Sequence, residues 1–273
     1  MHVGVIGLGI IGGVWARHYE SAGVLAATWN RSPKPDAPRI AANPREVARA
    51  ARVLHLVVAD PPAVSQILDA IEPELGSEHL VLQSTTIDPE SSKTFAARVK
   101  ARGAGYVEAP FMGSRPAAEQ KRVVLMLGGD EPAVARAEGV VKLLTEQCFR
   151  VGSEAQAAAL KLSFNLYVAI NMEGICESLN LARQSGLSED AYFRILEKTA
   201  LGSGFLTMKE PKLRAGDFAP QFSIKHMLKD IRLATQLATP GSTPLGQAVL
   251  ERLRTSAERG LNEEDMSALI KTL

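Results

Sequence analysis

The stretch "GVIGLGIIGGVWARHYESAG", residues 4–23, decides the fold of this chain. It places Gly7-x-Gly9-x-x-Gly12 between an apolar run typical of a buried strand and a helical pattern. In that context the spacing indicates the first turn of a βαβ unit that binds a dinucleotide. Gly7 permits the tight turn, Gly9 lets the backbone approach a pyrophosphate, and Gly12 lets the helix pack closely on the strand. We expect the phosphate site to include the residues between these glycines, Leu8, Ile10 and Ile11.

Apolar runs and helical patterns alternate over the first half of the chain. Strands are predicted at 2–7, 24–29, 53–59, 79–85, 105–111, 122–129 and 148–153. Helices are predicted at 10–22, 44–51, 62–72 and 88–102, and another opens at "GGDEPAV" (128–134) and runs to about Leu144. Such alternation predicts an α/β Rossmann domain with a doubly wound, mainly parallel sheet.

The second half has a different pattern, because no strand is predicted after Gly152. One long helix is predicted over 154–184, ending at Gly186. Further helices are expected at 188–198, 203–214, 224–238, 243–259 and 262–271. The sequence therefore predicts a cofactor-binding domain over 1–152 and an all-α domain for substrate binding and oligomerisation over 153–273, joined by the long helix.

Composition excludes several kinds of partner. The 31 basic and 30 acidic side chains give a net charge of +1, which argues against nucleic acid or a membrane surface. No apolar stretch approaches the roughly 20 residues that span a bilayer, and a strand beginning at His2 leaves no room for a signal peptide. We therefore expect a cytoplasmic protein. The two cysteines and five histidines show no metal-binding spacing, so no metal is expected.

The end of the second strand indicates the choice of cofactor. An NAD site usually has a carboxylate there, which accepts a hydrogen bond from the ribose 2′-hydroxyl. This chain instead has "WNRSPKP" (29–35), with Asn30, Arg31 and Ser32 at that position. A guanidinium can pair with a 2′-phosphate, so NADP(H) is preferred over NAD(H). The alternative is that Arg31 is a solvated loop cation.

Several separated motifs resemble the β-hydroxyacid dehydrogenase family, which includes 3-hydroxyisobutyrate dehydrogenase and the glyoxylate and succinic semialdehyde reductases. These motifs cover nearly the whole chain: "GVIGLGIIGG" (4–13), "VVADPPAV" (57–64), "STTIDP" (84–89), "EAPFMGS" (108–114), "GSEAQAAALKLSFN" (152–165) and "FSIKHMLKDIRLA" (222–234). The segment 222–234 is most similar to the reductase branch of the family.

The resemblance implies an NADP(H)-dependent oxidoreductase that acts on a small aldehyde or a 2- or 3-hydroxyacid in a cleft between its domains. It also implies a homo-oligomer, a dimer or a tetramer. Beyond the first motif and residues 30–32, it assigns cofactor contacts to Val58, Ala59, Asp60, Thr86 and Lys229. It assigns substrate contacts to Met112, Gly113, Ser114, Phe222 and Asp230.

Lys161 is the candidate proton donor that a nicotinamide enzyme needs beside a reacting carbonyl. It lies on a helix rich in alanine and leucine, and a lysine desolvated between two domains has a lowered pKa. Asn165 follows four residues later, on the same helix face. By resemblance, Lys161 protonates the alkoxide and Asn165 orients lysine and substrate. The alternative is a surface lysine; Lys225 and Lys229, also four residues apart, could likewise form a solvated basic stripe.

The segment "EAPFMGS" departs from the family pattern. Phe111 replaces the usual valine, and Met112 replaces a serine whose hydroxyl helps to hold a substrate carboxylate. We expect weaker handling of a compact carboxylate such as glyoxylate and more tolerance for apolar carbonyls; alternatively, Ser114 and Arg115 hold the carboxylate. Two other functions stay open: an imine reductase, which shares the fold but lacks the lysine, and a non-catalytic cofactor-binding interaction protein.

Overall fold

The computed structural model describes residues 2–273. The chain forms two compact units that divide after Leu162. That point lies inside α7 (Glu154–Gln184), so by contacts the first turns of this helix belong to the first unit and its remainder to the second. The sequence instead places the domain boundary ahead of the helix, at 152/153.

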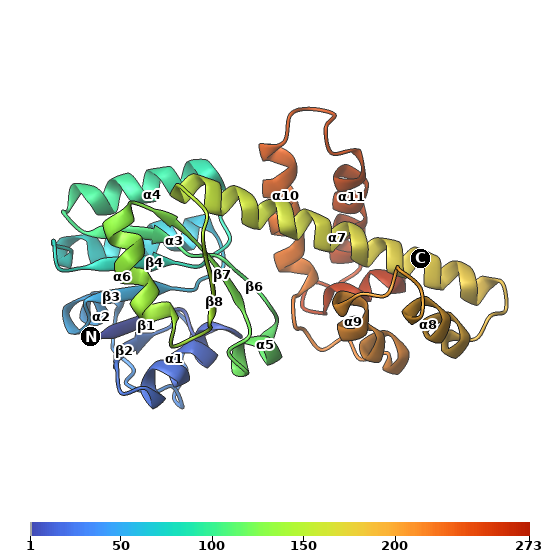
Figure 1. Cartoon of the computed structure of the whole chain (residues 1–273), viewed down its shortest axis with the longest axis horizontal. Coiled ribbons are helices and arrows are strands. Elements are labelled where there is room, and N and C mark those ends of the chain that lie inside the picture. The colour runs from blue at the N-terminus through green and yellow to red at the C-terminus, as the bar shows by residue number, and fades with distance from the viewer. Residues whose placement is uncertain (1) are drawn as a thin grey trace. The chain divides into compact units, whose positions relative to one another are not determined.

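The first unit is built on a mixed sheet (Figure 1). Its strand order is β2-β1-β3-β4-β5-β7-β6, with β8 paired to β7. The first five strands in that order are parallel, β7 is antiparallel to β5 and β6, and β8 is parallel to β7. The strands are β1 (Val3–Ile6), β2 (Leu25–Trp29), β3 (Val53–Leu56), β4 (Leu80–Gln83), β5 (Gly105–Glu108), β6 (Phe111–Met112), β7 (Val124–Gly129) and β8 (Gln147–Arg150).

Helices cover both faces of this sheet. Every residue of the central strands β1, β3 and β4 is therefore buried. One apolar cluster joins the sheet to α1 (Gly12–Ser21), α5 (Arg115–Glu119) and α6 (Glu131–Val141). A second cluster joins it to α2 (Pro44–Ala50), α3 (Pro61–Ile71) and α4 (Pro89–Ala101), and a short 3₁₀ turn, Glu72–Glu74, follows α3. The Gly-rich turn lies between β1 and α1, at the carboxyl end of a central parallel strand.

The segment 105–111, predicted as one strand, is two strands in the structure. β5 ends at Glu108, and Pro110, which has no N–H to donate to a ladder, separates it from β6. Phe111 and Met112 then pair antiparallel with Leu125 and Val124 of β7. The predicted substrate loop therefore begins with two residues whose backbone is fixed in a sheet. The short helix α5 that follows was not predicted.

The second unit is helical. α7 is followed by α8 (Glu189–Glu197), α9 (Gly204–Ala215), α10 (Ile224–Leu237) and α11 (Pro244–Glu258). α10 and α11 pack side by side (Figure 1), and a buried cluster links them to α7. The helix predicted at 262–271 was wrong in type: a 3₁₀ helix, Met266–Thr272, ends the chain. The predicted architecture, a mainly parallel Rossmann sheet followed by an all-helical part, is confirmed.

Candidate functional site

The Gly-rich turn owes its path to two close backbone approaches. Gly7 has φ +100°, and a Cβ there would lie 2.2 Å from the carbonyl oxygen of Val57. A Cβ at Gly12 would lie 1.9 Å from the carbonyl oxygen of Gly7. Both positions therefore require glycine for the fold itself, and the turn lies against the segment that follows β3.

Gly9 differs from its two neighbours in the motif. No described atom beyond its chain neighbours would lie within 4 Å of a Cβ placed there, so packing does not require glycine. In the described chain the first turn of α1 carries no acidic residue, and Ile11 supplies no side-chain cap. Open space beside an uncapped helix N-terminus suits a phosphate group. The motif thus fits a dinucleotide.

The turn after β2 is held to the Gly-rich turn by a side chain. Asn30 Oδ1 accepts a hydrogen bond from the Leu8 backbone N–H at 2.8 Å, and Asn30 Nδ2 donates to the Ser32 carbonyl at 2.8 Å. Arg31 and Ser32 are exposed, and within residues 2–273 Arg31 forms no ion pair. The structure therefore gives Asn30 a structural role and leaves the Arg31 guanidinium available to an anion.

The segments after β3 and β4 border the same turn. The Val58 N–H donates to Thr85 Oγ1 at 2.9 Å, and Ala59 is exposed. Asp60 caps α3, because its carboxylate accepts from the Ala63 N–H at 2.9 Å. Thr86, the predicted cofactor contact, is half-buried beside Thr85. Thr85, which the sequence did not single out, ties these two segments together.

Lys161 meets the predicted substrate segment directly. Its Nζ donates a hydrogen bond to Met112 Sδ at 3.3 Å and lies 5.6 Å from the centroid of the Phe111 ring. The Lys161 residue is only 9% exposed. The alternative of a solvated surface lysine is therefore wrong, and two of the predicted motifs come together at this amine.

A buried aromatic group lies behind Phe111. The Trp15 ring contacts Phe111 edge-on at 4.9 Å and stacks on His55 at 4.8 Å. Tyr19 OH donates to His55 Nδ1 at 3.0 Å, because the other ring nitrogen donates to Ser84 Oγ at 2.8 Å and that hydroxyl donates onward to a carbonyl. Burial lowers the pKa of His55 to about 3, so the ring is neutral. No sequence motif indicated this group.

The residues that follow Met112 differ in how far the structure commits their side chains. Gly113 has φ +142°, and a Cβ there would lie 2.9 Å from Val123 Cγ1. Arg115 Nε donates to Glu119 Oε1 at 2.8 Å, so its charge is already paired along α5. Ser114 precedes α5 without a side-chain cap bond among the described residues. Of the two predicted alternative ligands, Arg115 is therefore bonded within α5, whereas the Ser114 hydroxyl does not cap that helix.

Glu108, the first residue of the same segment, is completely buried. Gln83 Nε2 donates to its Oε1 at 2.8 Å, and the hydroxyls of Ser92 and Tyr106 donate to its Oε2 at 2.6 and 2.8 Å. Burial raises the pKa of Glu108 to about 8, although these three donors favour the ionised form. The side chain is therefore an acid that holds its proton at neutral pH.

Replacing Glu108 with glutamine should remove a pH dependence of stability. The folded chain keeps the Glu108 proton to about pH 8, whereas the unfolded chain loses it near the ordinary pKa of 4.5. Between these values the unfolded state binds fewer protons, so the free energy of unfolding falls as pH rises. Urea unfolding from pH 5 to 8 should show this fall in the wild type relative to Glu108→Gln. Parallel curves for the two proteins would contradict the assignment.

In the second unit, Asn165 and Asp230 form a buried pair. Asn165 Nδ2 donates to Asp230 Oδ2 at 2.6 Å, and both residues are 2% exposed. This bond directs the amide nitrogen of Asn165 to the carboxylate and leaves its carbonyl oxygen as an acceptor for another group. Asn165 lies one turn after Lys161 on α7, so both side chains leave the same helix face.

Lys229 lies beside this pair. Its Nζ is 2.7 Å from Asp230 Oδ1, an ion-pair distance, but the approach lacks hydrogen-bond geometry, and this buried oxygen has no hydrogen-bond partner among residues 2–273. Lys225, by contrast, is exposed and contacts Glu263 at 3.4 Å. A solvated stripe therefore describes Lys225 and not Lys229.

Phe222 is positioned by a buried ion pair that the sequence did not indicate. Lys209 Nζ lies 2.7 Å from Asp265 Oδ1, and both side chains are almost wholly buried. Asp265 Oδ2 accepts the backbone N–H groups of Gln221 and Phe222 at 2.9 and 3.1 Å. Asp265 thereby fixes the segment that leads into α10, which carries Lys229 and Asp230.

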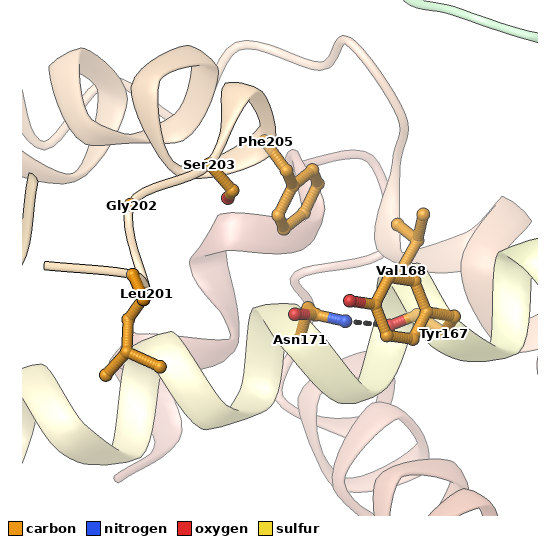
Figure 2. Close-up of a pocket in the computed structure, with 8 residues that line it drawn as sticks. Tyr167, Val168, Asn171, Leu201, Gly202, Ser203 and Phe205 are labelled. Atoms are coloured by element: carbon orange, nitrogen blue, oxygen red, sulfur yellow. Dashed lines mark hydrogen bonds between the residues drawn. The ribbon is translucent and has the colours of Figure 1, made fainter.

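A hollow of about 300 Å³ opens on the second unit between α7 and the segment 200–205 (Figure 2). Tyr167 and Asn171 face Ser203 and Phe205 across it, and Asn171 Nδ2 donates to the Tyr167 carbonyl at 2.7 Å. No predicted site residue lines it.

In the described chain, no cluster of histidine, cysteine or carboxylate side chains could hold a metal ion. No helix among the described residues has the length and apolarity to cross a membrane.

Comparisons with known proteins match both halves of the chain. Residues 2–152 match the NAD binding domain of 6-phosphogluconate dehydrogenase, and residues 155–273 match the NAD-binding domain of NADP-dependent 3-hydroxyisobutyrate dehydrogenase. Glyoxylate/succinic semialdehyde reductase 1 of Arabidopsis thaliana is 28% identical over 100% of this chain and 98% of its own length. Cytokine-like nuclear factor N-PAC of Mus musculus is 27% identical over 98% of this chain and 50% of its own length.

Solved structures share the fold over its whole length. The crystal structure of 3-hydroxyisobutyrate dehydrogenase from Salmonella typhimurium has a TM-score of 0.90 to this chain, with 24% sequence identity and 100% coverage of both chains. At that identity the likeness concerns the fold. The two sequence matches together include the Gly-rich turn, the part of α7 that carries Lys161, and α10.

Proposed function

This chain belongs to the β-hydroxyacid dehydrogenase family, and on that premise we propose that it is an NADP(H)-dependent oxidoreductase acting on a small aldehyde or a 2- or 3-hydroxyacid. The observation that carries the proposal is the position of the Lys161 side chain. The residue is buried, and its Nζ lies 3.3 Å from the sulfur of Met112 in the predicted substrate segment. A buried lysine amine beside such a segment is suited to proton transfer. The relatives named as reductases support the same chemistry.

Lys161 is the proton donor to the carbonyl oxygen during reduction and the acceptor from the hydroxyl during oxidation. A bound nicotinamide would supply or accept the hydride. Asn165 presents its amide oxygen because its nitrogen is committed to Asp230. Asp230 thus orients Asn165 through Oδ2, while its Oδ1 lies 2.7 Å from the Lys229 amine.

The cradle for the pyrophosphate gives a prediction at Gly9. Gly9→Ala should raise the Kd for NADPH by about tenfold or more, equivalent to about 1.4 kcal/mol or more, because a methyl group enters the space a phosphate needs. The melting temperature without cofactor should stay unchanged, since a Cβ there meets no described atom. Gly13→Ala is the matched control: its nearest atom is 3.7 Å away, and NADPH affinity should be kept. Equal Kd values for both variants and the wild type would contradict the assignment of the pyrophosphate site to Gly9.

The preference for NADP(H) rests on Arg31, which is exposed and has no ion pair within residues 2–273. Arg31→Ala should lower kcat/KM for NADPH by about 10- to 100-fold, the range for losing a charge-assisted hydrogen bond. The same variant measured with NADH is the control, because NADH lacks the 2′-phosphate. A parallel loss with both cofactors would show that Arg31 does not read the phosphate.

One assay separates the candidate functions. Purified protein with NADPH is given glyoxylate, succinic semialdehyde, methylglyoxal and a cyclic imine, and NADPH absorbance is followed. Oxidation of NADPH with at least one carbonyl is expected. Turnover of the imine alone would favour an imine reductase, and no turnover together with tight NADPH binding would favour a cofactor-binding interaction protein.

A further inference from the structure

Met112 makes a contact that a serine at this position could not make. Its sulfur lies 3.3 Å from Lys161 Nζ and accepts a hydrogen bond from it. A serine hydroxyl oxygen is bonded to Cβ, so it lies one atom nearer the backbone than this sulfur, which is bonded to Cγ. Where relatives place a hydroxyl, this chain places an acceptor long enough to reach its own lysine.

The backbone around Met112 is held firmly enough to aim that sulfur. Met112 pairs with Val124 and Phe111 with Leu125, so both residues belong to the sheet. The Met126 N–H donates to the Pro110 carbonyl at 2.9 Å, which fixes the entry to β6. Gly113, packed against Val123 with no space for a side chain, fixes the exit. Pairing with β7 therefore fixes the backbone from which the Met112 side chain reaches Lys161.

The second contact to the ammonium has the same chemical character. The Phe111 ring lies 5.6 Å from Lys161 Nζ and is itself backed by Trp15 at 4.9 Å. A thioether and an aromatic face are both uncharged and polarisable, and each attracts an ammonium weakly. Both groups therefore attract the Lys161 amine without carrying a full charge themselves.

We propose that Met112 is a positioning residue for Lys161. The Met112 sulfur accepts a hydrogen bond from the Lys161 amine and directs that amine toward the reacting carbonyl. The proposal rests on the proposed function of Lys161 as proton donor. It also deepens that function, since the position that holds a substrate carboxylate in relatives is here used by the protein's own amine. The favoured substrates are then carbonyl compounds that do not need a carboxylate anchor at this point.

The test compares Met112→Leu with Met112→Gln in the full-length protein. Leucine fills a similar volume but has no acceptor, whereas glutamine places an amide oxygen at a similar reach. With NADPH and the best carbonyl of the panel, Met112→Leu should lower kcat by about five- to tenfold, as for loss of one hydrogen bond. The KM for NADPH should not change, and Met112→Gln should restore kcat to near the wild-type value.

A second measurement does not depend on turnover. Competitive labelling of lysines with acetic anhydride, read by mass spectrometry of the Lys161 peptide, reports how reactive this amine is. Labelling should be faster in Met112→Leu than in the wild type or Met112→Gln, because an acceptor favours the charged, unreactive ammonium. Equal labelling and equal kcat in all three proteins would overturn the proposal. Different labelling without turnover of any carbonyl would support the positioning role and overturn the proposed reaction.

Discussion

Lys161→Met should lower kcat for carbonyl reduction by about 10²- to 10⁴-fold, the usual contribution of a positioned general acid. Methionine replaces the buried stem but carries no proton, so the loss reflects chemistry more than packing. The KM for NADPH should change little, because the Gly-rich turn and Arg31 lie on other elements of the first unit. Steady-state kinetics in which NADPH is varied at a saturating carbonyl concentration measures both quantities.

Lys93→Met is the matched control for that substitution. Lys93 is an exposed lysine on α4, in the same unit, and its loss should leave kcat unchanged. Thermal unfolding of Lys161→Met shows whether the fold persists. Turnover that survives in a folded Lys161→Met protein would remove Lys161 from the mechanism and leave the family fold without its proposed donor.

Asp265→Ala should destabilise the second unit by about 3–5 kcal/mol, because it leaves the Lys209 ammonium buried without its anion. The substitution also removes the acceptor of the Gln221 and Phe222 N–H groups. Burial disfavours charge on Asp265, yet Lys209 and the backbone N–H groups of Gln221 and Ser267 hold the pKa of its carboxyl below its usual range. The melting temperature of the second unit, measured by calorimetry, should fall by roughly 6–20 °C.

The exposed pair Lys225–Glu263 is the control for this prediction. It also joins a lysine to a carboxylate in the same unit, at 3.4 Å, but both side chains are exposed. Glu263→Ala should therefore leave the melting temperature almost unchanged. Similar losses from Asp265→Ala and Glu263→Ala would mean that burial does not set the strength of the Lys209 pair.

Much of the fold could be predicted from local patterns. The Gly-rich turn and the alternating runs predicted the parallel sheet, because buried parallel strands are apolar at every position. The long helix was predicted at 154–184 and found at Glu154–Gln184, since no proline interrupts it. The break at Pro110 was missed because the apolar residues on both sides of it resemble one strand.

The candidate site could be predicted only as a set of positions. Motif spacing brought forward Lys161, Asn165 and Met112, but spacing does not say which atoms meet. The sulfur–amine contact, the Asn165–Asp230 bond and the Asp265 anchor all join residues more than 40 positions apart in the sequence. Trp15 and His55 were missed for the same reason, since each is an ordinary core residue until the sheet places the two together.

The packing of Trp15 against Phe111 has a consequence for exchanging substrate segments between relatives. The size of residue 111 is matched to an indole that belongs to α1, the helix of the nucleotide cradle. Grafting a valine-serine version of this segment would leave a void beside Trp15 and remove the sulfur from Lys161 in one step. Residues 15, 111 and 112 therefore form an epistatic unit, and an evolutionary path or a redesign that changes substrate choice here has to change them together.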